Sequence, residues 1–114
     1  MTTMESNIRA IYTSWNAGNL DAVLAAFSAL GPQGYKIEYV GNAPLDGKPA
    51  LEEMWSQYGG SCTVDIVELL VNGNEAAVMV HNNVQTPEGI VTMPSIETYK
   101  VSDGSLTVRY YHSS

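Results

Sequence analysis

Four strand-like segments in succession dominate the second half of this 114-residue chain, and they constrain its fold more than any other feature. They span residues 62–71, 75–85, 90–101 and 105–112. Short turn sequences separate them, namely Asn72-Gly73, Thr86-Pro87-Glu88-Gly89 and Ser102-Asp103-Gly104. Asn72-Gly73 is the clearest hairpin signal, because both residues tolerate the positive φ of a tight turn. Strands joined by such short turns pair antiparallel, so these residues predict a four-stranded meander.

Ahead of the meander, the sequence predicts two helices. Thr2 and Glu5 form a capping box at the start of the first helix. Its apolar residues recur at helical spacing: Ile8, Ile11, Tyr12 and Trp15. Gly18 can end this helix, and Asn19 can cap the next one. The second helix repeats the apolar spacing and stops at residues 31–34, where the sequence is Gly-Pro-Gln-Gly.

One strand and a third helix complete the first half. Residues 35–40 alternate between two faces, as a strand does. A loop follows to Gly47, and Pro49 suits the first turn of a helix that ends at Gly59-Gly60. The order helix, helix, strand, helix and four strands predicts an α+β fold. The length predicts that residues 1–114 form a single domain.

The charge balance disfavours two classes of partner. Twelve acidic residues face five basic ones, giving a net charge of -7. A nucleic-acid-binding protein needs a basic surface, and an anionic membrane surface would repel this chain. The apolar runs are too short to cross a membrane, and the first residues do not have the pattern of a signal peptide. We therefore expect a cytoplasmic protein that binds neither nucleic acid nor membrane.

Four segments resemble a known superfamily across nearly the whole chain. They read WNAGNLDAVLAAFS, LDGKPALEEMW, VNGNEAAVMV and VRYYH. The chain resembles the nuclear transport factor 2-like superfamily, in particular its ketosteroid isomerase and SnoaL-like polyketide cyclase branch. The resemblance implies a cone-shaped, curved antiparallel sheet wrapped by three helices around an apolar pocket. It also implies a homodimer formed through the outer sheet face, because many members pair in that way.

The catalytic positions of the ketosteroid isomerases are only partly kept. The position of the general-base aspartate is occupied by Tyr39, and the position of the oxyanion-binding tyrosine by Ile11, with Tyr12 beside it. The carboxylic acid that acts as the second oxyanion donor corresponds to Glu97. The known steroid isomerase mechanism is therefore not expected here.

Strand alternation sorts the remaining candidates by face. Tyr39 shares a face with Ile37, Asn82 with Val84, and Glu97 with Tyr99. If these faces line the pocket, the candidate catalytic residues are Glu97, His112 and Tyr39. The candidate ligand-binding residues are Tyr12, Trp15, Trp55, Asn82, Val84, Tyr99 and Tyr110. A β-bulge would shift this alternation, and bent sheets often contain one.

Each polar candidate has a structural alternative. In an apolar pocket the pKa of Glu97 would rise, giving a neutral donor or a base near pH 7. On the outer face Glu97 would instead pair with Lys100 or Arg109. His112 could shuttle protons, although it lies near the end of the chain. His81 falls on the face opposite Asn82, so the two histidines do not indicate a metal site.

Two functions remain open from the sequence. The first is an enzyme that isomerises, dehydrates or cyclises an apolar carbonyl compound through an enol, without a metal or an organic cofactor. The alternative is a non-catalytic ligand-binding or dimerisation module of the same fold. The superfamily fold is compatible with both, because fold alone does not determine function.

Overall fold

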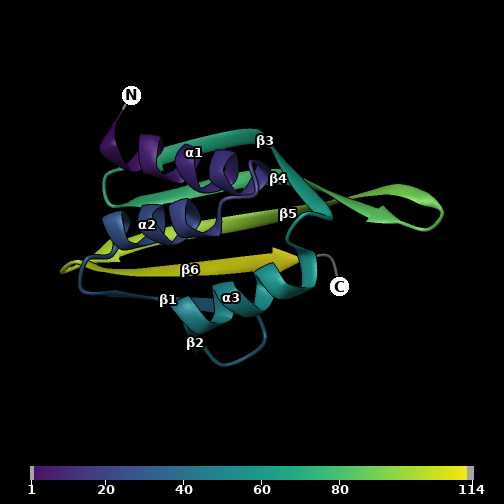
Figure 1. Cartoon of the computed structure of the whole chain (residues 1–114). Coiled ribbons are helices and arrows are strands. Elements are labelled where there is room, and N and C mark those ends of the chain that lie inside the picture. Colours follow the sequence, from purple (N-terminus) through teal and green to yellow (C-terminus); the bar gives the residue numbers. More distant parts are fainter. Residues whose placement is uncertain (1, 113–114) are drawn as a thin grey trace.

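The computed structural model describes residues 2–112 and shows three helices on one side of a curved, unclosed sheet (Figure 1). The elements are α1 (Thr3–Asn16), α2 (Leu20–Leu30), β1 (Gly34–Tyr39), β2 (Leu45–Asp46), α3 (Gly47–Tyr58), β3 (Cys62–Asn72), β4 (Glu75–Thr86), β5 (Gly89–Ser102) and β6 (Ser105–His112). The predicted α+β class is confirmed. We call the helix-covered face of the sheet the inner face and the opposite one the outer face.

The strand order is β2-β1-β6-β5-β4-β3, so the predicted meander from β3 to β6 is confirmed. Within the described residues the sheet is antiparallel, as expected, at every pair but one, since β1 runs parallel to β6 from Gly34↔Ser105 to Tyr39↔Tyr110. A parallel pair needs a long connection, and α3 with β3, β4 and β5 supplies it. The sequence also gave no sign of β2, whose two residues pair with β1 inside the predicted loop.

Side-chain caps fix the starts of the first two helices. The Glu5 amide donates to Thr2 Oγ1 over 3.0 Å, and the Ala22 amide donates to Asn19 Oδ1 over 3.0 Å. Helix α3 begins instead with a close approach to the sheet, because a Cβ added to Gly47 would lie 2.0 Å from the Tyr35 ring. A glycine at this position therefore lets α3 pack against β1.

The β3–β4 hairpin turns one residue later than predicted. Asn72 pairs with Glu75, so the two loop residues are Gly73 and Asn74 rather than Asn72 and Gly73. Gly73 has a φ of 63°, and a glycine at the first loop position is typical of a type II′ turn. A type I′ turn would need positive φ at both loop residues, as the Asp103-Gly104 turn shows with 51° and 80°.

A β-bulge in β3 reverses the alternation of that strand. The pairing with β4 skips Val67, which lies between Ile66 and Glu68. The extra residue places Leu69 and Val71 on the inner face, where they pack against the core. The core itself joins the apolar stripes of α1 and α2 to inner-face residues such as Val78, Val80 and Val108.

Strands β4 and β5 extend beyond their neighbours as a projecting hairpin (Figure 1). In the described chain, β3 reaches only as far as Val84 and β6 only as far as Ser95. From these residues towards the turn, β4 and β5 continue to pair with each other as far as Thr86↔Gly89. The hairpin exposes the apolar residues Ile90 and Val91, whereas its base reaches the cavity described next.

Candidate functional site

A cavity of about 670 Å³ lies between the helices and the inner face of the sheet. Its size is within the usual range for small-molecule sites. It is lined by eight of the ten residues named from the sequence: Tyr12, Trp15, Tyr39, Asn82, Val84, Glu97, Tyr110 and His112. Trp55 and Tyr99 do not line it, and both instead support residues that do. The residues that strand alternation selected on β1, β4, β5 and β6 thus lie around one cavity.

Glu97 is the buried carboxyl group of this cavity, with only 5% of the residue exposed. The Tyr12 hydroxyl donates a short hydrogen bond to Glu97 Oε1. The Ser95 hydroxyl donates to Glu97 Oε2 over 3.2 Å. The alternative placement of Glu97 on the outer face is wrong, because β5 keeps a regular register with β6 and turns this side chain inward.

Burial raises the pKa of Glu97 from an ordinary value of 4.5 to about 7. Desolvation is the larger cause, while the hydrogen bonds from Tyr12 and Ser95 lower the pKa. Among the described residues, no lysine or arginine lines the cavity to stabilise the carboxylate. Near neutral pH, Glu97 is therefore divided between an ionised form that accepts protons and a neutral form that donates them.

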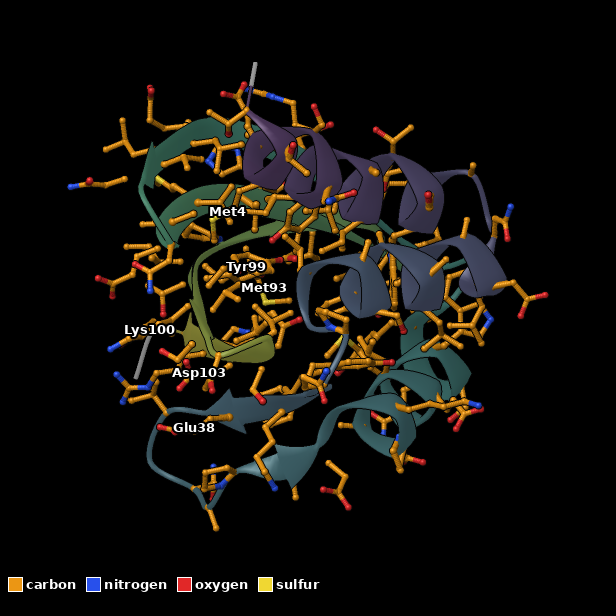
Figure 2. The ribbon with its side chains drawn as sticks, turned by 90° about the vertical axis from the view of Figure 1, so that its left-hand side faces the viewer. Met4, Glu38, Met93, Tyr99, Lys100 and Asp103 are labelled. Carbon is orange, nitrogen blue, oxygen red and sulfur yellow. The ribbon has the colours of Figure 1, made fainter. Side chains whose placement is uncertain are left out.

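Tyr99 holds Tyr12 in place from behind. The two hydroxyl oxygens lie 2.6 Å apart. Because Tyr12 gives its single proton to Glu97, Tyr99 must donate to Tyr12. Burial raises the pKa of both tyrosines well above 10, so both stay protonated. Figure 2 shows Tyr99 in the interior between sheet and helices, and the neighbouring Lys100 pointing away from the body.

Asn82 extends this series of hydrogen-bonded side chains on the Ser95 side of Glu97. Its Nδ2 donates to the Met93 carbonyl over 3.0 Å and to Ser95 Oγ over 2.9 Å. Both of its N–H groups are therefore used within the protein. The carbonyl oxygen of the Asn82 side chain is the atom that can meet a ligand donor.

An aromatic wall forms where β1 and β6 run side by side. The rings of Tyr39, Tyr110 and His112 are stacked, with interplanar angles between 19° and 27°. The Tyr39 and Tyr110 centroids are 5.6 Å apart, and each lies 6.4 Å from that of His112. Burial raises the pKa of both tyrosines, so their hydroxyl groups remain proton donors. The parallel register, which the sequence did not indicate, creates this wall.

The two tryptophans have different positions. Trp15 lines the cavity with its ring, and its Nε1 donates to the Cys62 carbonyl over 2.8 Å. Trp55 packs edge-on against Trp15, with ring centroids 4.9 Å apart. Trp55 thus fixes the orientation of Trp15 without facing the cavity.

Sequence reasoning missed Ser95 and the contribution of α3. Ser95 shares the face of Glu97, so strand alternation could have identified it. Helix α3 adds five residues to the lining, namely Leu51, Glu53, Met54, Gln57 and Tyr58. Leu51, Met54 and Tyr58 recur at helical spacing in the sequence, but nothing in that spacing distinguishes cavity-facing residues from core residues.

Two general features complete the description of residues 2–112. No cluster of three or more His, Cys, Asp or Glu side chains in this range could hold a metal ion. None of the three helices is long and apolar enough to span a membrane.

The SnoaL-like domain family matches residues 8–109 of this chain. No functionally curated protein matches it in sequence. The match covers every lining residue of the cavity except Tyr110 and His112, and it names no reaction.

Solved structures share the fold at low identity. SalBIII, an epoxide hydrolase/cyclase-like enzyme in pyran ring formation in the polyether salinomycin, has a TM-score of 0.77 and 17% identity, covering 96% of this chain and 90% of its own. A candidate polyketide cyclase from Xanthomonas campestris pv. campestris has a TM-score of 0.66 and 21% identity, covering 97% and 90%. TerC, co-crystallised with polyporic acid, has a TM-score of 0.76 and 13% identity, covering 98% and 92%. At these identities the likeness concerns the fold.

Proposed function

Because this chain belongs to the SnoaL-like family of the nuclear transport factor 2-like superfamily, we propose that it is an acid–base enzyme acting on an apolar, carbonyl-bearing small molecule. The observation that carries the proposal is Glu97, a buried carboxyl whose pKa of about 7 suits proton transfer near neutral pH. It sits beside a tyrosine hydroxyl in a cavity of ligand size.

The proposed reaction transfers a proton from one atom of the ligand to another by way of an enol intermediate. Ionised Glu97 takes a proton from the carbon next to the ligand carbonyl, and the electron pair moves to the carbonyl oxygen. Tyr12, Tyr39 and Tyr110 are the hydroxyl donors available to that oxygen. Neutral Glu97 then returns the proton to another atom, which completes an isomerisation, a dehydration or a cyclisation. A well-placed oxyanion donor typically contributes about 3–4 kcal/mol to such a step.

The lining favours an uncharged ligand with a flat ring. Two carboxyl side chains, Glu53 and Glu97, line the cavity, and among the described residues no lysine or arginine does so. A carboxylate or phosphate ligand would therefore be repelled. The stacked wall of Tyr39, Tyr110 and His112 offers a face to a planar ring. Polyketide-type carbonyl compounds combine these properties, and two of the similar structures are described as cyclases or cyclase-like.

The test is proton exchange on candidate ligands. Enolisable ring ketones in deuterium oxide are followed by NMR with the wild type, with Glu97→Gln, and with Glu68→Gln as an exposed control on the same sheet. We expect exchange that falls at least about 100-fold in Glu97→Gln and is unchanged in Glu68→Gln. Ligand binding with no exchange in the wild type would instead support a non-catalytic binding module.

We also propose that the protein forms a homodimer through the outer face of the sheet. Met79 and Ile96 are directly paired across β4 and β5, and Leu70 on β3 is also exposed on that side. Leu70 is 67% exposed and Ile96 47% exposed, and contiguous exposed apolar residues often mark an interface. Sedimentation velocity should show a dimer that Ile96→Glu converts to a monomer. A wild-type monomer at high concentration would rule the dimer out.

A further inference from the structure

Ser95 is a buried polar residue that the proposed reaction does not use. It is 4% exposed, it is absent from the cavity lining, and its hydroxyl lies between Asn82 and Glu97. A buried serine on an inner strand face needs hydrogen-bond partners, and here both partners are side chains of the site. Its position therefore links the ligand-facing Asn82 to the carboxyl group.

The direction of the hydrogen bonds at Ser95 is determined by Asn82. The Asn82 amide nitrogen can only donate, so Ser95 Oγ accepts from it over 2.9 Å. The single hydroxyl proton of Ser95 must then point to Glu97 Oε2, 3.2 Å away. Oε1 also accepts a hydrogen bond, from Tyr12, but Tyr12 lines the cavity and can turn its proton to a ligand or solvent oxygen, whereas Ser95 lies outside the lining. Protonation of Oε1 therefore leaves the displaced hydroxyl proton an alternative acceptor, and protonation of Oε2 does not.

We propose that Ser95, oriented by Asn82, is a positioning residue that directs the mobile proton of Glu97 to Oε1, the oxygen beside Tyr12. The catalytic role of Ser95 rests on the proposed function, whereas its effect on the position of the Glu97 proton rests on the hydrogen-bond geometry. It extends the site by one residue that contacts the catalytic group and not the ligand.

The placement of the proton couples Glu97 to Tyr12. While Glu97 is ionised, Tyr12 donates to Oε1. When the C–H bond of the ligand breaks, its proton forms an O–H bond at Oε1, and the electron pair moves to the ligand oxygen. The new Oε1–H group donates to the Tyr12 oxygen, so the Tyr12 proton can turn to the ligand oxygen. The oxyanion donor thus becomes free in the step that creates the oxyanion.

Other titratable groups surround the same carboxyl. They are Tyr12 on α1, Tyr39 on β1, Cys62 on β3, Tyr99 on β5 and Tyr110 on β6. Glu53 on α3 and His112 on β6 also line the cavity. The measurement must therefore report on Glu97 alone.

Infrared difference spectra between pH 5 and pH 9 meet that need. The C=O stretch of neutral Glu97 is assigned as the band that disappears in Glu97→Gln. With the proton on Oε1, the C=O oxygen is Oε2 and accepts from Ser95, so Ser95→Ala should move the band to higher wavenumber. The same change should raise the titration midpoint by about one pH unit, since one hydrogen bond to the carboxylate is lost.

Three further variants keep the test decisive. Ser95→Thr retains the hydroxyl and should restore both the band and the midpoint. Asn82→Ala frees the Ser95 hydroxyl and should shift both in the direction of Ser95→Ala, by a smaller amount. Thr98→Ala removes a hydroxyl from the same strand on the outer face and should change neither.

An unchanged band and midpoint in Ser95→Ala would overturn the positioning role, whatever the activity. Because no ligand is used, the two proposals can fail separately. A shifted band in a protein without proton-exchange activity would sustain the role of Ser95 and remove the proposed function. Exchange activity with an unchanged band would sustain the proposed function and remove the role of Ser95.

Discussion

Two glutamates on neighbouring parts of one sheet occupy opposite environments. Glu38 on β1 lies on the outer face, where Arg109 Nε donates to its Oε2 over 3.1 Å. Glu97 on β5 lies on the inner face, opposite Tyr110 in the β5–β6 register. Arg109 and Tyr110 are adjacent in β6 and point to opposite sides, so one strand gives Glu38 a cation and Glu97 an aromatic wall.

The difference shows how a sheet sets the chemistry of a carboxyl group. On the outer face, solvent and a guanidinium stabilise the charge of Glu38, and Figure 2 places this residue at the periphery. On the inner face, only neutral hydroxyl groups meet the Glu97 carboxyl, and burial raises its pKa to about 7. Alternation by one residue is enough to separate an ion pair from a candidate acid–base group.

The largest expected effect is the pH dependence of stability that Glu97 creates. Its pKa is raised in the folded state, so the folded chain binds more protons than the unfolded chain between about pH 4.5 and pH 7. The free energy of unfolding should therefore fall as the pH rises through this window, by about 3 kcal/mol, and stay level above it. Urea denaturation at several pH values should show this fall in the wild type and not in Glu97→Gln. An equal fall in both proteins would place the cause elsewhere.

Tyr12→Phe should have an intermediate effect. It removes the donor to Glu97 Oε1 and leaves the buried Tyr99 hydroxyl without its acceptor. We expect a loss of about 1–2 kcal/mol in the free energy of unfolding and a further rise in the pKa of Glu97. Tyr58→Phe, which changes an exposed tyrosine of α3, is the matched control. A stability equal to that of the wild type would show that the Tyr99–Tyr12–Glu97 chain is not maintained in solution.

Glu38→Gln should have the smallest effect. Its ion pair with Arg109 is partly exposed, and such pairs contribute little because solvent screens them. We expect a change in melting temperature below that of Tyr12→Phe, and one that vanishes at high salt. A loss larger than that of Tyr12→Phe would reverse the comparison between the two faces.

The sequence predicted most elements because each had a local cause. Helix caps at Thr2 and Asn19 and the turn at Asp103-Gly104 depend on a few neighbouring residues. The parallel pairing of β1 with β6 joins residues about seventy positions apart, and no local pattern encodes it. The bulge at Val67 was equally invisible, because an extra residue in a strand resembles the residues around it.

The site was predictable to the extent that it follows strand alternation. That rule places Asn82, Glu97 and Tyr110 on faces that meet the cavity. It gives a direction to each side chain but not the partner of each polar atom. Tyr99 therefore entered as a ligand-binding candidate, while its hydroxyl is directed to Tyr12. Only the packing of α1 against the sheet determines that contact.

The position of β6 has a consequence for how the molecule is assembled. This strand lies between β1 and β5, so without it β2 and β1 would be separate from β5, β4 and β3. During synthesis, β1 emerges long before its partner, and its apolar residues remain without that partner until residues 105–110 have been made. Contacts between such distant segments slow folding and prolong the exposure of apolar surface. The strand that completes the aromatic wall thus also forms the strand pair with the largest sequence separation in the described chain.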